Sequence, residues 1–252
     1  MFFSTRNNTK LFTASEALLL GIARDGGLFL PTEFHQIDVA SCLDLSYQEL
    51  AFKILRPYLD DFSDEEVRNC IEAAYSKKNF PERVVGLKHM EGKTFLELFH
   101  GPTLTFKDMA LSLLPHLMEV ALKKHGKSKV HILTATSGDT GSAVLCAFGK
   151  HPEFEVSVLY PNGGISYVQE RQMLSFSSSK SRAFALLNGN FDDCQTRVKN
   201  IFNNEELKKE LEDFKKAEYS SENLAVGWNN NLVHFTNTFK LCRSDKQNTE
   251  NN

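Results

Sequence analysis

The stretch KVHILTATSGDTGSAVLCAF, residues 129–148, decides the fold, because its residue pattern changes from that of a strand to that of a helix. Apolar and β-branched residues predominate in 130–134, Gly138 and Gly141 follow, and small and apolar residues then recur at helical spacing. This order predicts a buried strand, a turn and a helix. A turn of small hydroxyl residues that opens a helix presents backbone N–H groups, which can hold a carboxylate or a phosphate. An ordinary helix cap has similar residues, so both interpretations stay open.

Strands and helices are expected to alternate on both sides of this stretch. In chain order they are 94–99, the helix of Lys107, 129–134, the helix of Gly141, 155–160, 167–174, 182–187 and 191–202. Four such alternations predict an α/β fold with a parallel sheet and helices on its faces. Ligands bind beyond the carboxyl ends of the strands in such sheets. The loops of Lys107, Ser137 and Asn162 are therefore expected to converge.

The segment LELFHGPTLTFKD, residues 96–108, carries the main candidate for chemistry, Lys107. Thr105 and Asp108 form a Thr-x-x-Asp capping pattern, and apolar residues recur at helical spacing after them. Lys107 is thus expected in the first turn of a helix, where the dipole opposes an ammonium by about 0.3–1 kcal/mol and favours the nucleophilic amine. Pro115 is expected to kink this helix. An ordinary surface lysine is the alternative interpretation.

Residues 1–92 are predicted to form a helical N-terminal domain. Three helices are expected there, begun by Thr13 or Ser15, by Ser46 and by Ser63. Residues 93–211 are expected to form the parallel α/β domain that carries Lys107. Residues 212–252 lose clear periodicity and are expected to be a divergent, partly disordered tail.

Composition argues against several classes of function. The net charge of −3 gives no electrostatic case for binding nucleic acid or acidic membranes. No apolar run approaches the roughly twenty residues that span a bilayer, and the first residues do not read as a secretory signal. Five widely spaced cysteines without a Cys-x-x-Cys pair favour free thiols over disulfides or a metal site. A soluble, cytoplasmic protein is the default expectation.

Taken together, the two segments resemble the threonine synthase family of pyridoxal-phosphate enzymes. In that family a His-Gly-Pro-Thr-x-x-Phe-Lys-Asp segment carries the cofactor lysine, and a Thr-Ser-Gly-Asp-Thr-Gly loop holds the substrate. Both are intact here, at 100–108 and 136–141. Residues 24–31, 159–170 and 188–195 are also similar to the family. Within the family, the sequence most resembles the threonine synthase-like 2 branch.

The resemblance implies a fold type II enzyme in which Lys107 binds pyridoxal 5'-phosphate covalently. It also implies cofactor contacts from Phe106 and Asp139, although a core position for the Phe106 ring is an equally good interpretation. The implied substrate-binding residues are Thr136, Ser137, Gly138, Asp139, Thr140 and Gly141. No metal is implied.

The implied activity is that of a phospho-lyase, which converts a small phosphorylated amino acid, O-phosphothreonine or O-phosphohomoserine, to 2-oxobutyrate, ammonia and phosphate. The resemblance runs from about Ser15 to about Lys209 and stops before the family's glycine-rich loop for the cofactor phosphate. A truncated or alternatively spliced form with weak or absent catalysis is therefore expected. The alternative is a non-catalytic short isoform that binds a protein partner on the face left by the missing large domain, conceivably as a secreted signalling factor.

Overall fold

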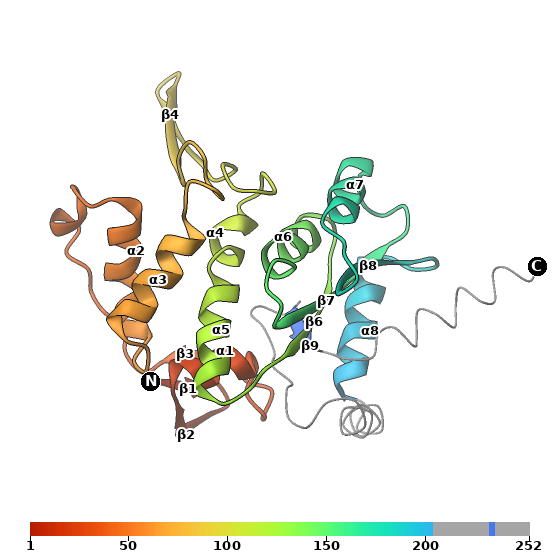
Figure 1. The fold of residues 1–252 in the computed structure, drawn as a ribbon, viewed down its shortest axis with the longest axis horizontal. Helices are drawn as coiled ribbons and strands as arrows, with labels where there is room; N and C mark the ends of the chain where they lie inside the picture. The colour runs from red at the N-terminus through yellow and green to blue at the C-terminus, as the bar shows by residue number, and fades with distance from the viewer. Residues whose placement is uncertain (204–231, 235–252) are drawn as a thin grey trace, which may run out of the picture. The chain divides into compact units, whose positions relative to one another are not determined.

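The computed structural model describes residues 1–203 and 232–234, and Figure 1 traces the chain through them. The chain divides into two compact units, Met1–Gly126 and Lys127–Asn252. Each unit has its own secondary structure and its own buried residues. The domain boundaries expected near residues 92 and 211 stay predictions, and the expected tail lies outside the described residues except for 232–234.

The second unit is built on a four-stranded sheet in the order β8-β7-β6-β9. Its strands are β6 (Val130–Ala135), β7 (Phe154–Pro161), β8 (Ser181–Leu186) and β9 (Leu232–His234). The first three run parallel, and β9 pairs antiparallel with β6. Every residue of β6 is buried, as is typical of a parallel strand covered on both faces. The predicted parallel sheet is confirmed for these three strands, whereas β9 was not expected.

Helices cover both faces of this sheet (Figure 1). They are α6 (Asp139–Phe148), α7 (Tyr167–Ser175) and α8 (Phe191–Asn203). Buried residues of α8 pack against Leu133 and Leu159, while Gly141 of α6 faces the side chain of Val158. Successive residues of a strand point to opposite faces, so Val158 and Leu159 place α6 and α8 on opposite sides of the sheet.

The strand predicted at 94–99 does not join the parallel sheet. β5 (Lys93–Glu97) instead pairs antiparallel with β4 (Gly86–Met90) in a separate hairpin of the first unit. Glu91 and Gly92 form its two-residue turn with φ values of 51° and 72°, and positive φ at both positions matches the twist of a tight hairpin. The prediction of four alternations within one sheet is therefore wrong for this strand.

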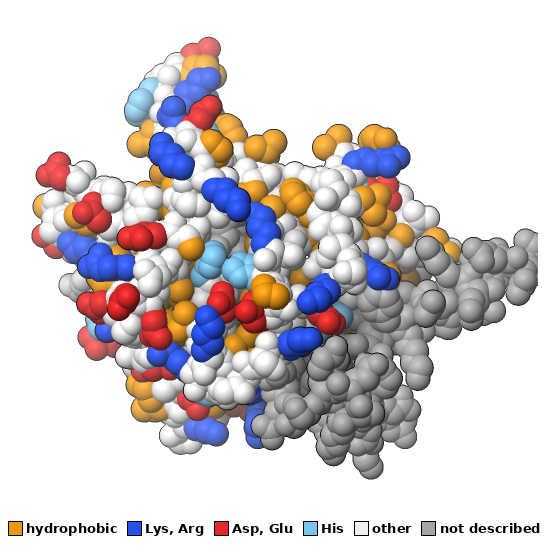
Figure 2. All heavy atoms as spheres, viewed as in Figure 1, with side chains coloured by type: hydrophobic (Ala, Val, Ile, Leu, Met, Phe, Trp, Pro, Cys, Tyr) orange, Lys and Arg blue, Asp and Glu red, His pale blue; other side chains and the backbone are white. Residues whose placement is uncertain are grey.

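Exposed apolar side chains lie on both faces of the β4–β5 hairpin, and Figure 2 shows apolar side chains on the side of the hairpin that faces the viewer. These side chains are Leu87, Met90, Phe95 and Leu96. At the base of the hairpin, His100 Nε2 lies 3.0 Å from Glu97 Oε2, and both groups crowd Gly86. Because a two-stranded hairpin alone is only marginally stable in water, contacts at its base matter for its order.

The first unit contains the three helices predicted from capping residues. They are α1 (Ala14–Leu20), α2 (Tyr47–Leu55) and α3 (Asp64–Ala74), and Thr13, Ser46 and Ser63 each form a complete capping box with a Glu. Two 3-10 turns, at Ala40–Cys42 and Arg56–Tyr58, accompany them. The predicted helices are therefore confirmed together with their first residues.

The same unit also has a small antiparallel sheet that the expectation of a helical region missed. Its order is β2-β1-β3, with β1 at Phe2–Ser4, β2 at Asn7–Phe12 and β3 at Phe29–Pro31. Two of these strands have three residues, too few to show the alternation by which a half-buried strand is identified. The description of residues 1–92 as purely helical is therefore wrong.

The helix predicted to begin at Lys107 is divided into α4 (Lys107–Leu111) and α5 (Leu114–Lys124). Pro115 lies in the first turn of α5, where its missing N–H interrupts no helical hydrogen bond. The kink expected at Pro115 is confirmed as a break between two helices.

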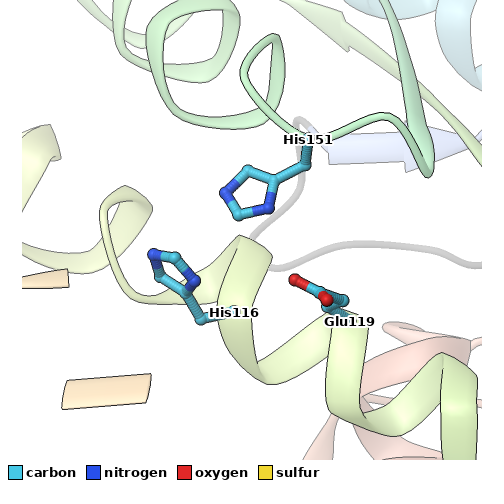
Figure 3. Close-up of side chains that lie close together, drawn as sticks. All are labelled: His116, Glu119 and His151. Atoms are coloured by element: carbon cyan, nitrogen blue, oxygen red, sulfur yellow. The ribbon is translucent and has the colours of Figure 1, made fainter. Parts of the chain in front are cut away.

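Farther along α5, His116 and Glu119 lie one turn apart (Figure 3). Among the helices that the structure describes, none is both long and apolar enough to cross a membrane.

Candidate active site

A buried carboxylate organises the loop before Lys107. Asp108 is 3% exposed, and its carboxylate accepts hydrogen bonds from the Thr103 N–H at 2.8 Å and the Thr103 hydroxyl at 2.6 Å. A Cβ on Gly101 would lie 2.4 Å from the Asp108 Cβ, so the loop approaches this side chain too closely for any other residue. Leu104 has φ of 60°, which is uncommon for a residue with a side chain. The position of Lys107 thus depends on Asp108.

The predicted capping box of Thr105 and Asp108 is wrong. The N-cap of α4 is Phe106, and it makes no side-chain cap hydrogen bond. The Thr105 hydroxyl instead accepts from the Lys107 N–H at 3.3 Å. Thr103 offers the Asp108 carboxylate two donors, an N–H and a hydroxyl, whereas a capping box offers it one.

Lys107 lies in the first turn of α4, as predicted, and is its first residue. Its Nζ lies 4.6 Å from the centre of the Phe106 ring, within the range of a cation–π contact. Phe106 is 57% exposed, so the interpretation of this ring as a core aromatic is wrong. Because α4 has five residues, its dipole is smaller than that of a long helix, and the effect expected on the amine is correspondingly small.

Tyr75 anchors α4 to α3 and was not singled out in the sequence. Its hydroxyl donates to the Met109 carbonyl oxygen at 2.8 Å. Burial raises the pKa of Tyr75, which keeps the hydroxyl protonated and able to donate. This contact joins residues 34 positions apart, so no local pattern could have indicated it.

The turn after β6 is organised by the side chain of Thr136. This residue is 1% exposed, and its hydroxyl oxygen accepts from the N–H groups of both Gly138 and Gly141, each at 2.9 Å. Those two amides are therefore already satisfied. Among the residues predicted to bind substrate, Thr136 therefore holds the turn together through its hydroxyl. Gly138 and Gly141 provide the two backbone amides that this hydroxyl binds.

The two glycines of the turn allow α7 to approach. A Cβ on Gly138 would lie 2.4 Å from the Gln169 side chain, and the φ of Gly138 is 136°. A Cβ on Gly141 would lie 2.5 Å from the Met173 sulfur. Since Gln169 and Met173 both belong to α7, glycine at these positions is a packing requirement of the loop and α7 together.

Three residues of the turn remain to meet a ligand. Ser137 is exposed, while Asp139 and Thr140 are partly buried in the first turn of α6. First-turn N–H groups have no carbonyl partner within the helix, so those of Asp139 and Thr140 can bind an anion. The Asp139 carboxylate accepts from Gln169 Nε2 at 2.7 Å. The turn therefore combines available amides with a carboxylate that is held by another helix.

Tyr160, at the end of β7, was also missed by the sequence reasoning. Its hydroxyl donates to the Glu170 carboxylate at 2.8 Å. Burial, together with this carboxylate, raises the pKa of Tyr160 to about 12. The bond links β7 to α7, just as the Asn162 N–H, bonded to the Leu186 carbonyl at 2.9 Å, links the end of β7 to β8.

The structure brings the residues of 136–141 into one turn and sets Phe106 beside Lys107. These two groups belong to different units, and β5, which precedes Lys107, belongs to the hairpin. The expectation that both loops follow strands of a single sheet is therefore wrong. Their convergence stays a prediction.

Comparison with known proteins gives the chain relatives of one kind. The family described as "Threonine synthase N terminus" matches residues 1–75. Threonine synthase of Schizosaccharomyces pombe is 36% identical over 220 residues, which are 82% of this chain and 43% of that protein. Human threonine synthase-like 1 is 36% identical over 206 residues, 77% of this chain and 27% of that protein.

Solved structures agree with these relatives. The pyridoxal-phosphate-bound threonine synthase from Brucella melitensis matches with a TM-score of 0.71 and 39% identity, over 81% of this chain and 45% of that one. Yeast threonine synthase matches with a TM-score of 0.71 and 36% identity, over 82% and 44% of the two chains. The chain thus spans less than half the length of these relatives. Similarity to the like-2 branch in particular stays a prediction.

Proposed function

Since this chain belongs to the threonine synthase family, we propose that Lys107 is its pyridoxal-phosphate lysine and that the 136–141 turn binds the substrate carboxylate. The observation that carries the proposal is the geometry of that turn, in which Thr136 satisfies two amides and leaves the first-turn N–H groups of Asp139 and Thr140 free of helical partners. The Brucella relative is described as bound to pyridoxal phosphate, which supports the proposal of this cofactor.

The described residues fit part of the cofactor. Lys107 provides the amine for a covalent link, and the neighbouring Phe106 is an exposed aromatic surface for a planar ring. The Lys107 amine would be taken up by that covalent link, and the Phe106 ring has no hydrogen-bond donor, so neither residue holds the cofactor phosphate. The proposal for these two residues therefore covers the covalent link and the ring alone.

The residues divide the proposed chemistry between them. When bound, pyridoxal phosphate supplies the electron sink that permits proton removal beside the substrate amine. Lys107 would hold the cofactor before the substrate binds, and its amine, once displaced by the substrate amine, can hold and move protons at neighbouring carbons. The amides of Asp139 and Thr140 orient the substrate through its carboxylate.

The proposed reaction is lysis of O-phosphothreonine or O-phosphohomoserine. The carbon–oxygen bond to phosphate breaks, one water is consumed, and 2-oxobutyrate, ammonia and phosphate leave. The resemblance implies a basic residue in many members of the family where this chain has Gly164, so recognition of the substrate phosphate is expected to be weak. We expect slow turnover, limited by binding of that phosphate.

The test is release of phosphate and 2-oxobutyrate from both substrates at saturating cofactor. Lys107→Ala is expected to abolish release, and Lys150→Ala, which removes an exposed lysine of the second unit, is expected to preserve it. Equal release by the chain and by Lys107→Ala, or no release by either, would contradict the lyase proposal. The relatives include proteins named threonine synthase, which favours the enzyme over the partner-binding alternative.

A further inference from the structure

One glutamine side chain connects the beginnings of two helices in the second unit. Gln169 Oε1 accepts from the N–H and the hydroxyl of Ser166, at 3.1 and 3.0 Å, and so completes the capping box of α7. Its Nε2 donates to Asp139 Oδ1 at 2.7 Å. A capping box needs only the oxygen of this amide. The nitrogen is therefore available to the Asp139 carboxylate, the first side chain of α6.

Gln169 also lies against the backbone of the turn. A Cβ on Gly138 would come within 2.5 Å of the carbon, nitrogen and oxygen of the Gln169 amide. The amide group thus covers Gly138 at contact distance. This contact adds to the hydrogen bond with Asp139, so Gln169 constrains both the backbone and the first side chain of the turn.

We propose that Gln169 is a positioning residue, which holds the Asp139 carboxylate so that the first-turn amides of α6 stay available to an anionic ligand. This inference rests on the proposed function of the turn. A carboxylate in the first turn of a helix is attracted to the same N–H groups and to the dipole, so it competes with a bound anion. The Gln169 amide satisfies one oxygen of Asp139 and adds no charge to the site.

The placement of Gln169 also explains how two loops act together. Asp139 follows β6 and Gln169 follows β7, and both lie beyond the carboxyl ends of these parallel strands. Ligand sites of such sheets form at this edge. The Gln169–Asp139 bond therefore sets the spacing of two loops that would meet one substrate.

Hydrogen exchange of the unliganded protein tests the coupling without cofactor or turnover. Gln169→Leu is expected to speed exchange of the 137–141 amides roughly tenfold, since a hydrogen bond to a charged group is lost. Ser166→Ala is the matched control, because it removes the cap hydroxyl of α7 but keeps the Ser166 N–H that donates to Gln169 Oε1, and with it the Gln169–Asp139 bond. The control is expected to leave exchange of the turn unchanged.

A double-mutant cycle separates positioning from general support of α7. Asp139→Ala and Gln169→Leu are expected to be non-additive, so that the double variant exchanges little faster than either single one. Gln169→Glu is expected to behave like Gln169→Leu at neutral pH and to approach the unmodified protein at low pH, where a protonated acid can again donate to Asp139. Additive effects, or a Gln169→Glu effect that does not change with pH, would overturn the inference.

Binding of O-phosphothreonine without cofactor completes the test. Backbone NMR signals of Asp139 and Thr140 are expected to shift on titration, and Gln169→Leu is expected to need roughly tenfold more ligand for half the shift. Equal affinities for Gln169→Leu and Ser166→Ala would contradict the positioning role. If the chain shows no Lys107-dependent turnover but Gln169 and Asp139 are still coupled in the double-mutant cycle, only the proposed function is contradicted. The two failures are therefore distinguishable.

Discussion

The two candidate segments both begin helices, but their loops are held by different means. The loop before Lys107 is held by the buried Asp108 carboxylate, which accepts from Thr103. The helix that follows this loop, α4, has only five residues. In the second unit, the turn follows a fully buried parallel strand, and the Thr136 hydroxyl binds two of its amides. The lysine is therefore presented by a locally bonded loop, whereas the 136–141 turn is fixed by the sheet and by α7.

The largest expected effect comes from adding a side chain at Gly138, where the Gln169 amide already occupies the space. Gly138→Ala is expected to lower the free energy of unfolding of the second unit by about 3 kcal/mol, because its Cβ meets the Gln169 amide and its φ suits only glycine. Gly163→Ala is the control, since Gly163 also has positive φ but no atom within 4 Å of its Cβ position. The control is expected to cost about 1 kcal/mol. Equal losses in urea unfolding would show that packing against α7 is unimportant.

Removal of the Asp108 carboxylate, which holds the loop before Lys107, is expected to act on the first unit alone. Asp108→Ala leaves the buried N–H and hydroxyl of Thr103 without this acceptor, at a cost of about 2–3 kcal/mol. Hydrogen exchange measured by mass spectrometry can report the two units separately. Asp44→Ala, which alters an exposed aspartate of the same unit, is expected to stay within about 0.5 kcal/mol. An equal loss of protection in the second unit would contradict independent support of the two loops.

Substitution of the hydroxyl in the turn is expected to have the smallest effect of the three. Thr136→Val keeps the volume but removes the acceptor of two amides, which should destabilise the second unit by about 1–2 kcal/mol. Thr136→Ser keeps the hydroxyl and is expected to lose less. This role would be supported if the Gly138 and Gly141 amides exchange faster in Thr136→Val than in Thr136→Ser. The reverse order would indicate that the methyl group holds the turn.

The parts of the fold that could be predicted from the sequence are those set by nearby residues. Thr13, Ser46 and Ser63 begin helices because each finds its Glu partner three residues later. The β6 strand and the turn after it were also predicted correctly, because an apolar run and the glycines that follow it are neighbours in the sequence. The strand predicted at 94–99 is found as β5, but its place in the parallel sheet was predicted wrongly, because its apolar run suits any strand and only the Glu91–Gly92 turn specifies a hairpin.

The parts of the candidate site that could not be predicted depend on partners distant in the chain. Asp139 and Gln169 are 30 residues apart, and Tyr75 and Met109 are 34 apart. No periodic pattern relates such pairs, since the fold brings them together only after α7 and α4 have packed. Asp108 shows the same limit over a shorter distance, because its bonds with Thr103 compete with the capping pattern that the sequence suggests.

Mapping the lysine that reacts with pyridoxal phosphate tests the central claim most directly. The chain would be incubated with limiting cofactor, reduced with borohydride, digested and analysed by mass spectrometry. The account predicts that the pyridoxyl group is found almost entirely on Lys107, and that Asp108→Ala, which releases the loop, spreads the label over other lysines. Labelling of many lysines in proportion to their exposure, with Lys107 no more reactive than Lys123 or Lys150, would contradict it.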